Sequence, residues 1–201
     1  MTAAALERFS ELRLAYFSWS RRAGMTGYIP ASLAFAALTG LMARVSFMLP
    51  WTPVPVTGQT FAVLLAGALL GRRGSLSQFM YIGLGAAGIP WFAHSPIPLP
   101  GPTMGYLAGF IVAPYVIGRV TESYPPVRRF SGLLLLLCLV NFIVIHGMGA
   151  AWLYIWLGTV QGQNPTLLSV LSMGSVPFIP GDIIKVLLAA VSAYLILPKT
   201  R

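Results

Sequence analysis

The sequence predicts an all-α integral membrane protein, a bundle of six transmembrane helices with the N- and C-termini on the cytoplasmic side. Hydrophobic residues fill 57% of the 201 positions and charged residues only 8%, whereas roughly 25% of residues are charged in soluble domains. The apolar residues fall into six runs that glycine, proline or basic residues separate. Arginine gathers in alternate connections between these runs, which is typical of loops that stay in the cytoplasm.

The first 24 residues are predicted to form a cytoplasmic extension, and residues 25–201 the membrane domain. Leu6, Phe9 and Leu12 recur at roughly helical spacing among charged residues, which favours a short helix lying on the membrane surface. The segment has neither a clean apolar core nor a small-residue cleavage site. We therefore expect it to be retained and not removed as a signal peptide.

Each apolar run is long enough, or nearly so, to cross a bilayer, which takes about 20 helical residues. The second and third runs are joined only by Arg72, Arg73 and Gly74, so they are expected to form a tight hairpin with a basic tip. Four prolines between positions 96 and 102 exclude a helix, so residues 91–102 are expected to be an external loop. The six expected spans are about 31–49, 56–71, 75–89, 103–120, 132–157 and 178–197.

The positive charges determine the predicted orientation. With the N-terminus inside, eleven of the thirteen Lys and Arg residues lie on the cytoplasmic side. The two exceptions, Arg44 and Lys185, lie near the outer ends of their apolar runs, and Asp182 precedes Lys185 by one helical turn. An ionised side chain in the hydrocarbon region costs about 2.5–3.5 kcal/mol on the insertion scale, so these residues are expected to face protein or a wet cavity.

Asp182 and Lys185 are the first candidates for a binding site. A spacing of three places them on the same face of the last helix, with an acceptor beside a cation. Such a pair suits a ligand that carries both N–H donors and a carboxylate. The alternative is structural: Asp182 caps its own helix, and Lys185 neutralises it.

Other polar residues of the spans allow two interpretations. Arg44 either lines the same pocket or extends to the outer headgroups. Gln59 either hydrogen-bonds a ligand, or caps the second helix or bonds to a neighbouring span. Asn141 and His146, both in the fifth run, are expected to make hydrogen bonds between helices and not to bind a ligand.

Aromatic residues flank the expected external loop. Trp91, Phe92 and Tyr106 either mark the membrane boundary or wall a pocket for an apolar ring system. His94 is expected to be a solvated loop residue. A small binding pocket that faces the outside is the function that the residues favour.

Several function classes are excluded by what the sequence lacks. It contains no HExxH, CxxC or GxSxG motif and no phosphate-binding glycine–lysine loop, so we expect neither an enzyme nor a metal or cofactor site. The net charge of +9 lies in separate clusters without interleaved aromatic residues, which argues against nucleic-acid binding. A channel would need polar residues at several depths, whereas the charged residues of the spans gather at one end.

Four segments resemble the signature segments of the BioY family, the biotin-binding S components of energy-coupling-factor (ECF) transporters. They are TPVPVTGQT (Thr52–Thr60), LGAAGIPWFA (Leu84–Ala93), GPTMGY (Gly101–Tyr106) and PGDIIK (Pro180–Lys185). The resemblance covers about residues 31–197. It implies a six-helix protein of the bacterial inner membrane that captures biotin outside. It also implies partners, a transmembrane coupling subunit and two cytoplasmic ATPases, which alone bind ATP.

The resemblance also implies roles for single residues. Asp182 is expected to accept hydrogen bonds from the ureido N–H groups of biotin and Lys185 to donate to its carbonyl or carboxylate, with Gln59, Thr103 and the aromatic residues named above around them. In the family, the loop before the GPTMGY-like segment commonly carries an arginine near the ligand. Here that loop has no arginine, and His94 and Arg44 are the candidate replacements.

The family's docking surface for its coupling subunit resembles a patch of small residues on the first helix. Ala36 and Gly40, four positions apart, match that pattern, and packing within the bundle is the alternative.

Two other functions of the protein stay open: an S component for another small vitamin, and a structural membrane protein that transports nothing.

Overall fold

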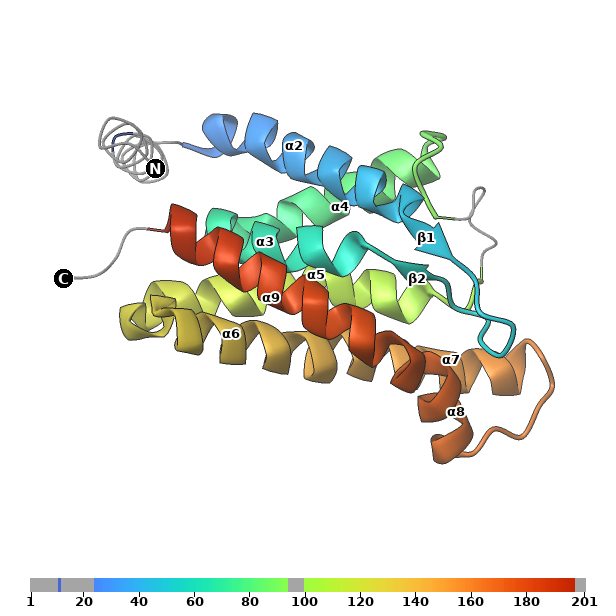
Figure 1. Ribbon diagram of the computed structural model, residues 1–201. Coiled ribbons are helices and arrows are strands. Elements are labelled where there is room, and N and C mark those ends of the chain that lie inside the picture. Colours follow the sequence, from blue (N-terminus) through green and yellow to red (C-terminus); the bar gives the residue numbers. More distant parts are fainter. Residues whose placement is uncertain (1–10, 12–23, 94–99, 198–201) are drawn as a thin grey trace.

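Helices that lie side by side make up nearly all of the structure, a computed structural model that describes residues 11, 24–93 and 100–197 (Figure 1). The expected interfacial helix therefore lies outside the described residues, apart from positions 11 and 24. Each of the six predicted apolar runs contains a helix. The helices are α2 (Met25–Arg44), α3 (Gln59–Leu70), α4 (Gly74–Ala86), α5 (Met104–Ser123), α6 (Phe130–Leu139), α7 (His146–Thr159), α8 (Leu167–Gly174) and α9 (Ile179–Ile196).

The segment between α2 and α3 corrects the predicted helix ends. The expected spans 31–49 and 56–71 are wrong at residues 45–49 and 56–58, where β1 (Ser46–Phe47) pairs antiparallel with β2 (Val56–Thr57). The prolines between these strands cannot extend either helix. Gly58 N donates to Met42 O at 3.1 Å and to Val45 O at 3.0 Å, so the returning chain closes onto the end of α2.

Helix α3 lies at the centre of the bundle. Ten of its twelve residues are buried, and it packs against α2, α5 and α9. This burial on all sides explains why α3 is apolar around its whole circumference. Close approach to α5 depends on Gly67, because a Cβ at this position would lie 2.7 Å from Pro114 Cα. The central position of α3 lets its first residues reach two neighbours: Gln59 bonds to Tyr81 of α4, and Thr60 to Asp182 of α9.

Helices α6 and α7 form one continuous helix that contains a π-helical turn, η3 (Val140–Ile145). The whole helix, Phe130–Thr159, has 30 residues. Helix α5 approaches it closely at Gly109, where a Cβ would lie 2.9 Å from Ile145 Cα. The π turn therefore faces the interior of the bundle.

The hairpin of α3 and α4 has the basic tip that the sequence predicts. A short 3₁₀ turn, η1 (Gly71–Arg73), joins the two helices. Gly71 has a φ of 65°, a conformation that favours glycine. Glu122 at the end of α5 accepts hydrogen bonds from Arg72 N at 2.9 Å and from Arg72 Nε at 2.6 Å. This basic end lies opposite the end formed by β1, β2 and α8 (Figure 1).

The surface of the bundle is rich in large apolar side chains, among them Leu135, Ile143 and Ile183, which are all more than half exposed. In the part of the chain that the structure describes, three stretches are long and apolar enough to cross a membrane. They are Met104–Ser123, Phe130–Thr159 and Leu167–Ile196. An exposed apolar surface of this extent suits a bilayer and not water.

Candidate functional site

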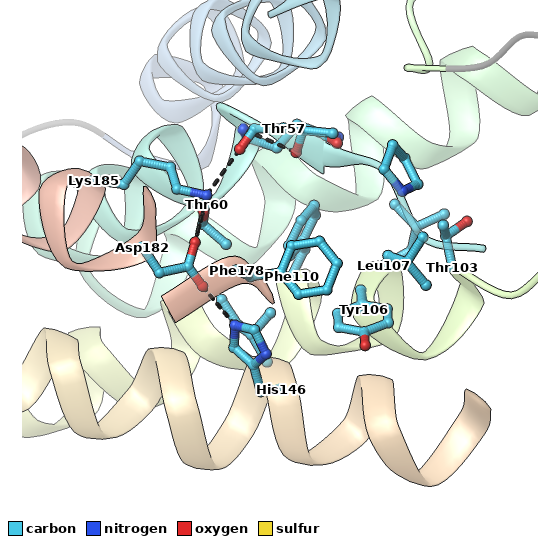
Figure 2. A pocket seen from close by; sticks show the side chains of 14 residues that line it. Thr57, Thr60, Thr103, Tyr106, Leu107, Phe110, His146, Phe178, Asp182 and Lys185 are labelled. Carbon is cyan, nitrogen blue, oxygen red and sulfur yellow. Dashed lines mark hydrogen bonds and ion pairs between the residues drawn. The ribbon is translucent and has the colours of Figure 1, made fainter. Parts of the chain in front are cut away.

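Asp182 is the centre of a buried polar cluster that three neighbouring helical segments build. The residue is 2% exposed. Its Oδ2 accepts a hydrogen bond from Asn141 Nδ2 at 3.0 Å and lies 2.5 Å from His146 Nε2. Its Oδ1 accepts from Thr60 Oγ1 at 3.4 Å and forms an ion pair with Lys185 Nζ. Figure 2 shows the Lys185 and His146 side chains converging on this carboxylate from two sides.

The start of α9 positions Asp182 and Lys185 as the sequence predicts. Pro180 and Gly181 lie in the first turn of the helix, and the spacing of three places both charged side chains on one face. Of the structural alternative, the cap hydrogen bond is absent, because α9 has no side-chain cap. Its other part is present, since Asp182 lies in the first turn of α9 and Lys185 forms an ion pair with it. Lys185 Nζ also donates to Thr57 O at 2.9 Å, which ties α9 to β2.

The π turn explains how Asn141 and His146 reach the same carboxylate. In a regular α-helix, residues five apart point about 140° away from each other. In a π turn the hydrogen bonds span five residues, so such residues come close to the same face. The hydrogen bonds between helices that the sequence predicted for Asn141 and His146 are therefore present, and both converge on Asp182.

A cavity of about 60 Å³ adjoins the polar cluster. Its polar side is formed by Asp182, Lys185 and His146, and its apolar side by Phe110 and Phe178. Figure 2 shows these two rings between the ion pair and the Thr103–Leu107 side of the cavity. The remaining lining residues are Val54, Pro55, Thr57, Gln59, Thr60, Thr103, Tyr106, Leu107 and Ile145.

A second cavity, of about 250 Å³, adjoins the first and shares Pro55, Gln59, Thr103 and Leu107 with it. Its other lining residues are Met48, Pro53, Tyr81, Phe92, Ala93 and Pro102. None of these ten residues is charged. The two cavities together form one site with an ion pair at one end and a neutral wall at the other.

Several predicted site residues lie at these cavities. Gln59 and Thr103 line both, Tyr106 lines the first and Phe92 lines the second. Gln59 Nε2 donates to Tyr81 OH at 2.8 Å, and Tyr106 OH donates to Gly174 O at 2.5 Å. These bonds hold both side chains in place. Gln59 thus bonds to a neighbouring helix, as one interpretation expects, and it also lines the cavities, so a hydrogen bond to a ligand stays a prediction.

Three other predicted site residues are not in the cavity walls that the structure describes. Arg44 is exposed at the end of α2 and lines neither cavity, which favours the alternative that it extends to the outer headgroups. Trp91 lies behind the wall, where its Nε1 donates to Tyr81 O at 2.9 Å. His94 lies outside the described residues.

Two small residues of α2, Ala36 and Gly40, face the interior. Ala36 is fully buried beside Tyr81 and Phe92. Gly40 is buried too, and a Cβ there would lie 2.9 Å from the ring of Trp91. The packing alternative is therefore correct for this pair. A docking surface on α2 would have to use its exposed residues instead of Ala36 and Gly40.

Sequence reasoning placed Asn141 and His146 in the helix interior but did not connect them with Asp182. One sequence feature hints at the irregular turn. Two polar residues five apart in an apolar run cannot share a face of a regular α-helix, so a common partner requires a local change in the helix. Phe110, Phe178 and Leu107 gave no signal, because apolar residues are common throughout these helices. Their role in the cavity follows only from the way the helices pack.

The arrangement can bind a small molecule with two unlike parts. A buried carboxylate accepts hydrogen bonds from N–H groups, and an ammonium beside it donates to a carbonyl oxygen. The adjoining apolar walls suit a nonpolar body, as in most small-molecule sites.

Comparison of the sequence with family models identifies the family: a model of the BioY family matches residues 20–201. The chain belongs to the BioY family. A protein of Methanothermobacter thermautotrophicus described as a probable biotin transporter BioY is 42% identical over 139 residues, which cover 67% of this chain and 88% of that protein. The biotin transporter BioY of Thermotoga maritima is 34% identical over 165 residues, which cover 79% of this chain and 89% of that protein. As a member of the BioY family, this chain is a membrane protein.

One solved structure has the same fold. A crystal structure at 2.1 Å, described as the S-component for biotin from an ECF-type ABC transporter, matches with a TM-score of 0.73 and 26% sequence identity. The match covers 83% of this chain and 88% of the other. The BioY fold therefore includes the mostly helical architecture described above.

Proposed function

We propose that this chain is the substrate-binding S component that captures biotin from outside the cell and mediates its uptake with an ATP-driven ECF module. One observation carries the proposal: in a chain of the BioY family, a buried Asp182–Lys185 ion pair lines a cavity with apolar walls. The S-component for biotin with the same fold supports the choice of ligand.

The chemistry of biotin fits the two parts of this cavity. Its ureido ring has N–H donors for Asp182 and a carbonyl oxygen for Lys185. Its sulfur-containing ring is apolar and suits the faces of Phe110 and Phe178. Gln59, Thr103 and Tyr106 surround the ligand in this arrangement, and Phe92 contacts the part that extends into the larger cavity.

We place both ends of the membrane domain, residues 25–201, on the cytoplasmic side, with six crossings by α2, α3, α4, α5, the α6–α7 helix and α9. The basic hairpin tip at Arg72 and Arg73 supports this orientation, because short loops rich in arginine stay in the cytoplasm. The cavity then lies towards the outside, where the ligand is captured. Residues 1–24 form the cytoplasmic extension.

Energy for uptake comes from partners in this proposal. The sequence has no phosphate-binding glycine–lysine loop of its own. The likeness to an S-component of an ECF-type ABC transporter supports two cytoplasmic ATPase subunits that bind ATP and a transmembrane coupling subunit that connects them to this chain. The chain itself is a binding protein and catalyses no reaction.

The test is isothermal titration of the detergent-purified protein with biotin, and with thiamine and riboflavin for comparison. We expect saturable one-to-one binding of biotin only. Glu122→Gln is a suitable control variant, because it neutralises an acid far from the cavity. Selective binding of another vitamin would indicate an S component with a different substrate, and binding of none would support a structural role.

A further inference from the structure

The distribution of charge around the two cavities limits what the site can recognise. Among the residues that line either cavity in the described part of the chain, the carboxylate of Asp182 and the ammonium of Lys185 are the only acidic and basic groups besides His146. Asp182 and Lys185 form an ion pair with each other. Among the described residues, the site thus has a compensated pair at one end and no cation at the other.

The ion pair is a poor partner for a ligand carboxylate. Lys185 Nζ already contacts Asp182 Oδ1 and donates to Thr57 O at 2.9 Å. A second carboxylate at this ammonium would lie beside that of Asp182, and like charges repel strongly where water is excluded. The acid group of the ligand is therefore expected at the opposite end, beyond Thr103 and Leu107, which Figure 2 shows on the far side of the cavity from Asp182.

The opposite end has no charged partner among the residues that the structure describes. The larger cavity is lined by neutral residues, with Gln59, Tyr81 and Thr103 as its polar side chains and Met48, Phe92 and prolines around them. The nearby sequence 94–99 contains no lysine or arginine. A carboxylate placed against such a wall would lose its hydration without gaining an ion pair, so it must extend towards water.

Resting on the function proposed above, we infer that this chain recognises the ring end of its ligand and is indifferent to the charge of the tail. It therefore binds neutral amides and esters of the acid as well as the acid itself. The specificity lies in Asp182 and Lys185, which bind the ring, whereas the larger cavity offers neutral walls to the tail.

The direct test compares biotin, biotinamide and biotin methyl ester as ligands of the purified full chain by titration calorimetry. We expect the three dissociation constants to agree within about threefold. A charge-assisted hydrogen bond to the acid group would instead favour biotin by about tenfold or more. That preference would overturn the inference while leaving biotin binding, and so the proposed function, intact.

A variant with a cation added to the larger cavity tests the same inference, because it should acquire a preference for the acid over the amide. Met48 lines the larger cavity and is 47% exposed, so Met48→Arg introduces a cation with little disturbance of packing. We expect this variant to prefer biotin over biotinamide by about tenfold, and Met48→Gln to show no preference. If neither Met48→Arg nor Ala93→Arg creates a preference, the tail does not lie in this cavity and the inference is wrong.

His94 provides a separate check, because it is the only group in the 94–99 sequence that can become cationic. We expect His94→Gln to bind biotin and biotinamide as the unaltered protein does. Selective weakening of biotin binding by this substitution would identify an acid-binding residue and overturn the inference. Failure of all three ligands to bind the unaltered protein would instead refute the proposed function, so the two failures can be told apart.

Discussion

Asp182 Oδ2 and His146 Nε2 lie 2.5 Å apart in the interior of the bundle, although 36 residues separate them in the sequence. A carboxylate can only accept a hydrogen bond, so His146 carries a proton on Nε2 and donates it to this contact. Together with Asn141 and Thr60, His146 holds the carboxylate in one orientation. The acceptor is therefore fixed before a ligand arrives, which lowers the entropy cost of binding.

The role of His146 can be tested with two substitutions that differ only in their ability to donate. His146→Gln retains an N–H donor for Asp182, whereas His146→Leu does not. We expect His146→Leu to weaken biotin binding about tenfold, and His146→Gln to stay within about threefold of the unaltered protein. Titration calorimetry measures both. Equal effects of the two variants would show that the side chain contributes only its volume.

The ion pair makes a prediction about stability as well as binding. Asp182→Asn leaves the ammonium of Lys185, which is 14% exposed, without its counter-ion. Removing one partner of a buried pair costs about 3–5 kcal/mol. We expect a clear fall in the thermal unfolding temperature in detergent, and loss of biotin binding because the acceptor for the ureido N–H groups is gone.

A double variant separates the two effects. Asp182→Asn with Lys185→Met contains no unpaired charge, so we expect it to recover much of the stability that Asp182→Asn loses, but not biotin binding. Glu122→Gln removes an exposed salt bridge to Arg72 and is expected to cost at most about 1 kcal/mol. If Asp182→Asn bound biotin with unchanged affinity, Asp182 would not be a biotin-binding residue.

The sequence allowed the positions of most helices and the pairing of Asp182 with Lys185 to be predicted, because both depend on local patterns. Each of the six apolar runs contains a helix, and the spacing of three placed Asp182 and Lys185 on one face. The ends of α2 and α3 were predicted less well. Residues 46–47 and 56–57 lie in runs apolar enough for a helix, and their pairing as β1 and β2 depends on a contact between residues about ten positions apart.

The predictions for Arg44 and for Ala36 with Gly40 had the same weakness. Arg44 was a candidate for the pocket because it lies at the outer end of a helix, but the depth of a residue does not determine which way it faces. Ala36 and Gly40 have the spacing of a docking surface, and the same spacing serves for packing inside a bundle. Which face of α2 is free depends on where α4 and Trp91 lie, and no local pattern encodes this.

The π turn predicts an unusual tolerance to deletion. A π turn accommodates one extra residue, so removing the exposed Ile143 can convert η3 into regular α-helix without rotating the flanking helices. Asn141 and His146 would then be four apart and still share a face. We expect the variant lacking Ile143 to bind biotin within about threefold of the unaltered protein.

Deletion of Leu135 is the matched control, because this residue is also exposed but lies within the regular helix α6. Its removal must rotate one side of the helix by about 100° relative to the other. We expect it to abolish biotin binding in the same calorimetric assay. Equal loss of binding in both deletions would contradict the role of the π turn in aligning Asn141 with His146.

Substitution of Gly40 distinguishes internal packing from docking to a partner. A leucine at this position must displace Trp91, since even a Cβ would lie 2.9 Å from its ring. Overpacking of this kind costs about 1–3 kcal/mol, so Gly40→Leu is expected to lower the unfolding temperature of the isolated chain. Ala37→Leu, on the exposed side of the same helix, is the control and should leave that temperature unchanged. A docking role for Gly40 requires the reverse: normal stability of the isolated chain, normal biotin binding and loss of uptake in cells.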